Sequence, residues 1–320
     1  MKDNSLKRKT ERKRRSGMIN LLARLLKEKP LGTVGLLITL LLLLAGVFAN
    51  FIAPYGMNAV GAGPSLSAPS IHFWLGTDNL GRDLLSRIIY GARISVIVGL
   101  IGAAISVVLS TIIGILSAYI GGAFDLIMQR IVDAWMCIPP LILMMVLISM
   151  VGPGMWQVII VMGLSFGITG SRIVRSSTIS MKANMYLEAS RALGCSNTRI
   201  LTKHILPNIM STIIILFSTL VPTMILTEAS LSFLGFGIAP PAPSWGGMLT
   251  GSARNYMFMA PWLVIWPGVA LSIVVYGVNV FGDALRDLLD PRLMGGVGRY
   301  GVKIKKGDTV KSKLAARSDG

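Results

Sequence analysis

Long apolar runs dominate this chain and limit the folds that it can adopt. A helix of about 20 apolar residues is long enough to cross the hydrocarbon core of a bilayer. Six such runs occur, at residues 31–53, 92–120, 126–151, 156–174, 209–234 and 261–282. With 53% hydrophobic and only 14% charged residues, the composition does not fit a water-soluble core. We therefore predict an all-α integral membrane protein with six transmembrane helices.

The formal net charge of +17 would ordinarily suggest nucleic acid as a partner. Most of the 31 Lys and Arg residues, however, fall in three segments, at residues 1–30, 172–204 and 286–320. With six spans, all three segments lie on the same side of the membrane. The positive-inside rule then places both termini and the 175–208 loop in the cytoplasm. The charge is therefore interpreted as an orientation signal, and we predict no nucleic-acid partner.

These positions divide the chain into three parts. A transmembrane domain at 31–285 lies between a basic cytoplasmic N-terminal tail, 1–30, and a basic cytoplasmic C-terminal tail, 286–320. The run Lys7–Arg15 is also compatible with a nuclear localisation or lipid-binding patch. The first apolar run is too long for a signal peptide, and no small-residue cleavage site follows it. We expect it to stay as an anchor, with membrane lipid as a partner.

Catalytic and cofactor-binding patterns are not evident in the sequence. The two histidines, His72 and His204, are predicted on opposite sides of the membrane and cannot share a metal ion. Residues 163–167 match a Gly-x-Ser-x-Gly nucleophile motif by letter, but that motif needs a strand-to-helix turn and here lies inside a span. Cys137 and Cys195 are too far apart to suggest a redox role. No phosphate-binding loop occurs, so we predict a non-catalytic chain whose ATP and Mg²⁺, if required, are bound by partner subunits.

Small residues recur every four positions along the second span. The stripe comprises Gly102, Ser106, Ser110, Gly114, Ala118 and Gly122. Small residues at this spacing let helix backbones approach closely inside a membrane. We interpret the stripe as a helix-packing face rather than as a direct transport path.

Four charged residues lie within or at the ends of the predicted spans, where an unpaired charge is costly. Arg130 and Asp133 have helical i,i+3 spacing, which predicts a structural ion pair near the cytoplasmic surface. Asp125 precedes them on the same span. Glu228 has no local partner, and two interpretations stay open: it faces a water-filled translocation path, or it lies at the membrane interface.

Two connections on the side away from the cytoplasm are rich in Gly and Pro. They cover residues 54–90 and 235–260, and both carry little positive charge. We predict that they form the face that meets an external component.

The polar cytoplasmic loop has the pattern of two short helices joined by a turn. Residues 184–193 are good helix formers, and Gly194 is well placed to end that helix in a left-handed conformation. Ser196 or Asn197 can cap a second helix, which Pro207 separates from the next span. We predict a short helical hairpin held between two membrane helices.

A DNA-binding helix-turn-helix has a similar pattern. Ser190, Gly194 and Ile200 match its small residue, its turn glycine and its branched aliphatic residue. A membrane-anchored regulator is therefore an alternative. Only about 34 residues separate the flanking spans, which is too few for the third helix and core that such a module needs.

The same loop resembles a known motif of membrane transport proteins. Its Glu188–Ser190 segment, followed by Gly194 and by His-Ile-Leu-Pro at 204–207, resembles the cytoplasmic loop of permease subunits of binding-protein-dependent ABC importers. Ser190 replaces the Ala at the third position of the Glu-Ala-Ala motif, and His204 stands where the broad family often has Ile. His-Ile-Leu-Pro-Asn is instead similar to the peptide and nickel permease subfamily. Further segments that resemble its "C-type" subunit lie at 72–93, 228–246 and 279–292.

This resemblance implies a type I ABC importer permease fold in a bacterial or archaeal cytoplasmic membrane. It also implies the partners: a second, homologous permease in a heterodimer, two ATPase subunits and an extracytoplasmic solute-binding protein. The implied function is ATP-driven import, with di- or oligopeptides as the favoured solute. A stand-alone secondary transporter or channel is the alternative, although no inverted repeat is evident. The coupling helix that contacts the ATPases is implied at Glu188, Ala189, Ser190, Arg191, Ala192 and Gly194.

Overall fold

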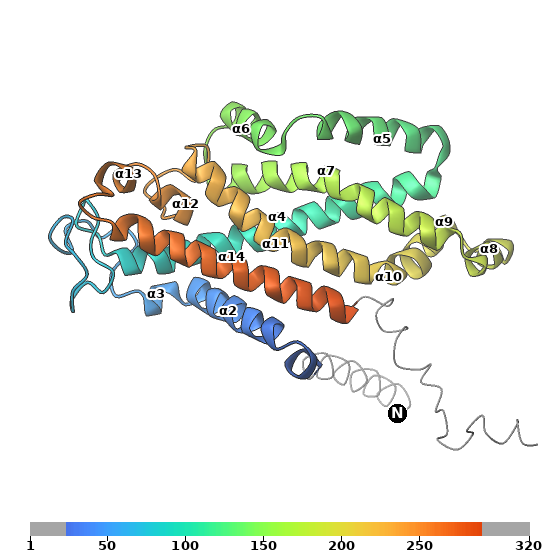
Figure 1. The fold of residues 1–320 in the computed structure, drawn as a ribbon. Coiled ribbons are helices and arrows are strands. Elements are labelled where there is room, and N and C mark those ends of the chain that lie inside the picture. The colour runs from blue at the N-terminus through green and yellow to red at the C-terminus, as the bar shows by residue number, and fades with distance from the viewer. Residues whose placement is uncertain (1–23, 290–320) are drawn as a thin grey trace, which may run out of the picture. The chain divides into compact units, whose positions relative to one another are not determined.

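The computed structural model describes residues 24–289. The predicted basic tails therefore lie largely outside the described residues. Across 24–289 the chain is helical, without a strand apart from an isolated bridge between Thr77 and Asp83. The elements are α2 Pro30–Val47, α3 Ala49–Ile52, α4 Leu84–Ile120, α5 Gly122–Met136, α6 Pro140–Val151, α7 Met155–Lys182, α8 Met185–Ala192, α9 Asn197–Arg199, the π-helical segment η1 Ile200–Ile205, α10 Leu206–Asn208, α11 Met210–Phe233, α12 Trp245–Met248, α13 Ser252–Tyr256 and α14 Trp262–Leu289 (Figure 1).

Helices α2, α4, α7, α11 and α14 are each long and apolar enough to cross a membrane. The pair α5 and α6 passes the same test together, but the two helices meet at 89°. The described residues therefore contain five such helices, or six if the bent pair counts as one span. The fourth predicted span, which has the most polar sequence, forms one of the longest helices, α7.

The predicted third span, 126–151, is not one continuous helix. The break falls between Met136 and Pro140, at the residues that join α5 to α6. Proline lacks a backbone N–H and disfavours the helical conformation in the residue before it. Pro139 accordingly has extended backbone angles, with φ −54° and ψ 127°, and Pro140 begins the next helix.

Helices α4, α7 and α14 extend beyond the predicted apolar runs because polar residues continue them, and α14 runs to Leu289 rather than ending at residue 282. The first run, 31–53, is instead divided between α2 and α3. Helix α4 begins at Leu84 rather than at residue 92, since Asp83 caps it by accepting a hydrogen bond from the Ser86 backbone N–H at 2.8 Å. Helix α7 continues to Lys182 rather than ending at residue 174. The loop that joins α7 to α11 is therefore shorter than predicted.

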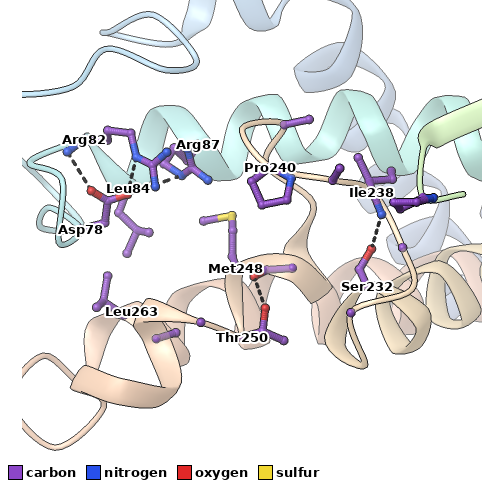
Figure 2. A pocket seen from close by; sticks show the side chains of 18 residues that line it. Asp78, Arg82, Leu84, Arg87, Ser232, Ile238, Pro240, Met248, Thr250 and Leu263 are labelled. Carbon is purple, nitrogen blue, oxygen red and sulfur yellow. Dashed lines mark hydrogen bonds and ion pairs between the residues drawn. The ribbon is translucent and has the colours of Figure 1, made fainter.

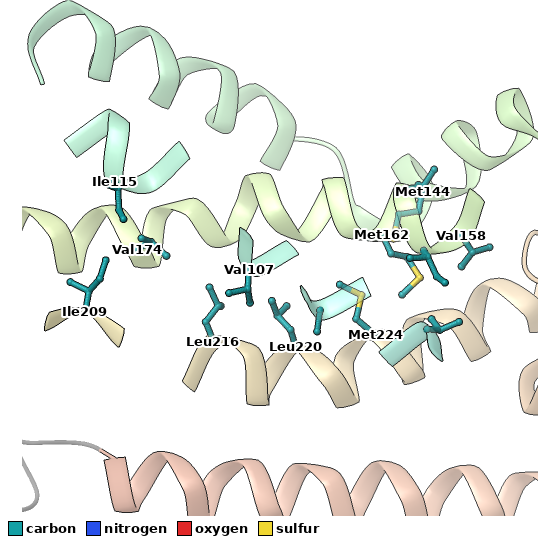
Figure 3. Close-up of a cluster of buried hydrophobic side chains, with 14 of the residues drawn as sticks. Val107, Ile115, Met144, Val158, Met162, Val174, Ile209, Leu216, Leu220 and Met224 are labelled. Carbon is teal, nitrogen blue, oxygen red and sulfur yellow. The ribbon is translucent and has the colours of Figure 1, made fainter. Parts of the chain in front are cut away.

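The core is formed where α4, α7 and α11 pack together, and α4 and α7 share the most extensive contact between two helices in the described chain. Figure 3 shows apolar side chains from these helices meeting in this core, among them Val107, Ile115, Val174, Leu216 and Leu220. The middle of the predicted small-residue stripe, from Ser106 to Gly114, lies at the α4–α7 contact, whereas Gly102 faces Met224 of α11 and Gly122 begins α5. The Ser106 and Ser110 hydroxyls donate to the carbonyls of Gly163 and Gly167 at 3.0 and 2.8 Å.

Candidate functional site

The predicted helical hairpin is present between α7 and α11, and we call residues 183–209 the coupling loop. Its first helix, α8, follows Asn184 and contains eight residues. Leu187 is buried in the main core cluster. The rest of α8 faces outward, with Glu188, Ala189, Arg191 and Ala192 exposed and Ser190 half-buried.

Gly194 forms the turn after α8. Its φ of +79° is the left-handed conformation predicted for it, and its N–H donates to the Arg191 carbonyl at 2.9 Å. The Cys195 N–H donates to the Ser190 carbonyl at 3.1 Å. Ser196 then caps the next helix by accepting from the Arg199 N–H at 3.4 Å. The turn and the cap follow the sequence prediction.

The second arm of the coupling loop differs from the single helix that the sequence predicts. It consists of the short helix α9, the π-helical segment η1 and the short helix α10. Ile200 and Ile205, at the two ends of η1, are fully buried in the same core cluster as Leu187. Three buried aliphatic side chains thus attach the coupling loop to the membrane helices.

Tyr119, near the end of α4, is a further contact that sequence reasoning missed. Its hydroxyl donates to Asn197 Oδ1 at 2.7 Å, and the Arg191 guanidinium lies 5.4 Å from the centre of its ring. The Lys182 ammonium donates to the carbonyls of Ala118 and Tyr119 at 3.2 and 3.0 Å, which satisfies the last carbonyls of α4. The end of α4 therefore contacts both arms of the coupling loop.

Ion pairs connect α5 to α7 close to the coupling loop. The predicted Arg130–Asp133 pair forms at 3.3 Å, but the Arg130 side chain is 73% exposed and such a pair contributes little. Asp133 also pairs with Arg172. Asp125 accepts from Arg175 Nε at 2.7 Å and from Arg175 Nη2, so the two planar groups pair at both ends. These contacts fix the N-terminal part of the bent span against α7.

At the opposite end of the bundle lie residues 54–83 and 234–261, which we call the distal end. Glu228 lies beneath it and is only 1% exposed, so other residues of this chain cover it. The Ser232 hydroxyl donates to Glu228 Oε1 at 2.6 Å and accepts from the Ile238 N–H at 3.1 Å. Through Ser232, Glu228 holds the segment after α11 onto that helix.

Replacing Ser232 with alanine should loosen this part of the distal end. The buried Glu228 oxygen and the Ile238 N–H would both lose their partner, at a cost of about 1–3 kcal/mol. Limited proteolysis should therefore cut the 235–251 segment faster in Ser232→Ala. Ser230→Ala is the matched control, because the Ser230 hydroxyl donates only to the Leu226 carbonyl of its own helix at 2.9 Å. Equal cleavage of both variants would contradict the role of Ser232.

Chemical groups that could form a metal or nucleophile site are not brought together in residues 24–289. Within them, no group of three or more His, Cys, Asp and Glu side chains is placed to hold a metal ion. The Gly-x-Ser-x-Gly residues lie inside α7, where an added Cβ at Gly163 or Gly167 would meet Ile105 or Leu109 of α4 at 2.7 Å. The two glycines therefore serve close helix packing.

These features define a class of protein: a helical, multi-pass membrane protein with an exposed helical hairpin attached firmly at one end of its bundle. Comparison with known sequences narrows the class. The chain belongs to the family of binding-protein-dependent transport system inner membrane components, whose sequence pattern matches residues 110–295. A permease of this family works with ATPase subunits and a solute-binding protein, and the role fits a non-catalytic chain.

Relatives with assigned names cover most of the chain. The oligopeptide transport system permease protein OppC of Bacillus subtilis is 37% identical, over 83% of this chain and 87% of its own length. The glutathione transport system permease protein GsiD of Pectobacterium atrosepticum is 37% identical, over 84% of this chain and 89% of its own length. The chain is accordingly a permease of the peptide subfamily of ABC importers. Neither the secondary transporter or channel nor the membrane-anchored regulator is supported by these relatives.

A solved structure has the same fold. A chain of the MetNI methionine ABC transporter, from a structure of its inward-facing conformations, matches with a TM-score of 0.52. The match has 19% sequence identity and covers 64% of this chain and 96% of that chain. The predicted type I importer permease fold is thereby confirmed.

Proposed function

We propose that this chain forms half of a translocation path for short peptides and pairs with a second, homologous permease. The names of its relatives, which include oligopeptide and glutathione permeases, support a peptide as the solute. The bent pair α5 and α6 exposes four aliphatic side chains, those of Ile127, Ile131, Ile142 and Val146. These side chains support a contact of this pair with another protein or with lipid. We assign ATP and Mg²⁺ to the ATPase subunits. The basic segments support a cytoplasmic position for the coupling loop and both termini.

The coupling loop is the surface that we assign to the ATPase subunits. The observation that carries this assignment is the exposure of two large apolar side chains in an otherwise polar loop: Met185 and Leu193 are each 85% exposed. They lie at the two ends of α8, on either side of Glu188, Ala189, Arg191 and Ala192. A short helix that presents apolar ends and small central residues fits a groove on a partner protein.

Movement of the ATPases can reach the membrane helices through contacts within this chain. Leu187, Ile200 and Ile205 attach the coupling loop to the core, and Tyr119 contacts both of its arms. Coupling requires the ATPase pair to bind the loop with different affinity in its two states, since only differential affinity shifts a conformational equilibrium. Gly194 sets the angle between the two arms.

The proposed function is tested by reconstitution of the complete complex in liposomes. The complex comprises this chain, its second permease, the ATPase subunits and the binding protein. We expect uptake of a radiolabelled dipeptide that requires ATP on the side of the ATPases. If ATP drives no peptide uptake while the ATPases are active, the peptide assignment is wrong.

Reversing the charge of Glu188 should weaken the contact with the ATPases without affecting insertion. Glu188 is exposed on α8 and makes no contribution to the core, so Glu188→Lys is expected to fold normally. A charge at the rim of an interface contributes about 1 kcal/mol, which corresponds to roughly fivefold weaker ATPase binding. Glu28→Lys is the control, since Glu28 is an exposed acid outside the coupling loop. Equal retention of the ATPases by both purified variants would argue against Glu188 as a contact residue.

A further inference from the structure

A cavity of about 420 Å³ lies at the distal end of the bundle. Its walls come from the segment before α4 and the start of that helix, the connection between α6 and α7, the end of α11 and the segment after it, the short helices α12 and α13, and the start of α14. Figure 2 shows Arg82 and Arg87 on one side of the cavity, with Met248 and Leu263 opposite them. Most of the lining is apolar, so the two guanidinium groups and Asp78 supply its charge.

Arg87 is buried without a full set of partners. Its side chain is only 10% exposed, and its Nη1 atom has no hydrogen-bond partner among the described residues. The carboxylate of Asp78 is 3.8 Å from Arg87 Nε, which is an ion-pair distance but too long for a hydrogen bond. Arg87 lines the cavity, although its unpartnered Nη1 atom is itself covered by protein atoms.

Asp78 is already occupied by other donors. Its Oδ2 accepts from Arg82 Nε at 2.6 Å, and its Oδ1 accepts from the backbone N–H groups of Leu80 and Arg82 at 2.9 and 3.0 Å. Among the residues that line the cavity, one carboxylate thus faces two guanidinium groups. Burying a charge without a counter-ion is costly, so this arrangement favours an anion in the cavity.

The shape and chemistry of the cavity indicate which anion. The planar fork of an arginine matches the geometry of a carboxylate. The apolar side chains of Leu84, Ile238, Met248 and Leu263 suit an apolar group attached to that carboxylate. The volume lies in the range of about 300–1,000 Å³ that is typical of small-molecule sites. A compact solute fits these features better than a protruding segment of a protein.

We propose that this cavity is a solute-binding site in which Arg87 binds the C-terminal carboxylate of a short peptide. The assignment rests on the proposed function for its choice of solute, whereas the carboxylate specificity follows from Arg87 alone. The apolar wall takes up the side chain next to that carboxylate. The site thus selects peptides with a free C-terminus at the end of the permease that lies opposite the coupling loop.

The test compares the dipeptide Ala-Phe with its C-terminal amide. Both are titrated by saturation-transfer NMR against the complete permease–ATPase complex in nanodiscs, without the binding protein. Arg87→Gln removes the charge, and Arg93→Gln is the matched control. Arg93 lies on the same helix but donates to the Gly46 carbonyl and Asn50 Oδ1 at 3.0 and 3.2 Å, away from the cavity.

We expect the wild type and Arg93→Gln to bind the acid roughly ten- to a hundredfold more tightly than the amide, as for the loss of one charge-assisted contact. Arg87→Gln should bind both forms with the same, weak affinity. Equal binding of acid and amide by the wild type overturns the proposal, and this comparison needs no variant to fold. A preference for the acid that is retained in Arg87→Gln also overturns the proposal.

Two further arms separate the alternatives. If Arg87→Gln weakens docking of the binding protein but leaves the preference for Ala-Phe acid unchanged, the carboxylate belongs to the binding protein and the proposal is wrong. Peptide uptake by the wild-type complex is measured in parallel. If the wild-type complex takes up peptide but binds acid and amide equally, this inference is wrong and the peptide function still stands. Absence of uptake overturns the peptide function, while an acid preference lost in Arg87→Gln still supports a carboxylate site.

Discussion

Replacing Gly194 with valine is expected to reduce ATP-driven uptake strongly while the chain remains folded in the membrane. Gly194 has a φ of +79°, a conformation that β-branched residues strongly avoid. An added Cβ would meet no atom within 4 Å, so the penalty arises from the backbone alone. Strain of about 1–3 kcal/mol is sufficient to change the conformation of the turn and the orientation of α8. We expect uptake to fall roughly tenfold or more.

The measurement is peptide uptake and ATPase activity of the reconstituted complex. Gly194→Asn is the matched control, because asparagine tolerates the left-handed conformation and should retain most of the activity. Thermal unfolding of the isolated variants checks that both are folded. If Gly194→Val supports the same uptake and ATPase activity as the wild type, the geometry of this turn has no role in coupling.

Leucine at Gly114 should prevent the helices from packing and therefore reduce the amount of folded protein. Gly114 belongs to the small-residue stripe on α4. A Cβ atom at this position would lie 2.6 Å from the Ser171 carbonyl oxygen and 2.8 Å from the Arg175 backbone nitrogen. Both atoms belong to the backbone of α7, so neither can move aside without separating the two helices. Overpacking of this kind costs about 1–3 kcal/mol or more.

A second glycine in a membrane helix serves as the control, because it separates the effect of side-chain size from the effect of the position in the structure. Gly268 lies inside α14, and an added Cβ there would meet no atom within 4 Å. Gly268→Leu carries the same change in side chain and the same change in helix propensity. We expect Gly114→Leu to lower the melting temperature in detergent and the yield of monodisperse protein, and Gly268→Leu to alter neither. Similar behaviour of the two variants would show that close packing of α4 and α7 does not limit stability.

Much of the fold could be predicted because the length of each apolar run can be read directly from the sequence. A helix must have a minimum length to cross a membrane, so the runs that are long enough predict the spans. The break in the third span was also visible in the sequence, since Pro139 and Pro140 stand inside its apolar run. Length and hydropathy alone do not register such a break. Helices α4, α7 and α14 extend beyond their apolar runs because polar residues continue a helix as well as apolar ones do.

The contacts of the coupling loop could be predicted only in part. Gly194 and Ser196 act through their own backbone neighbours, so their roles are readable locally. Tyr119 acts on Asn197, far along the chain, and the pairing of Asp125 with Arg175 crosses from one helix to another. Such contacts depend on the rotation of each helix about its axis, which the sequence of a nearly uniform apolar helix does not reveal.

The surroundings of Glu228 also could not be predicted from the sequence. An acid near the end of a span predicts a functional or interfacial position, and the sequence left both open. The structure instead joins it to Ser232, on the next turn of its helix, and covers it with the segment that follows. That cover depends on how the 235–251 segment folds back, which is a property of the tertiary structure.

Helix α4 joins the two ends of the molecule as one continuous rod. Its 37 residues contain no proline, and at 1.5 Å per residue they extend about 55 Å. Tyr119 at one end contacts the coupling loop, and Arg87 at the other lines the distal cavity. For a rod of this length, a tilt of about 5° at one end displaces the other by about 5 Å. A solute that favours one tilt of α4 therefore changes the affinity of the coupling loop for its partner. Because linkage is reciprocal, binding of that partner changes the affinity of the cavity for the solute by the same factor.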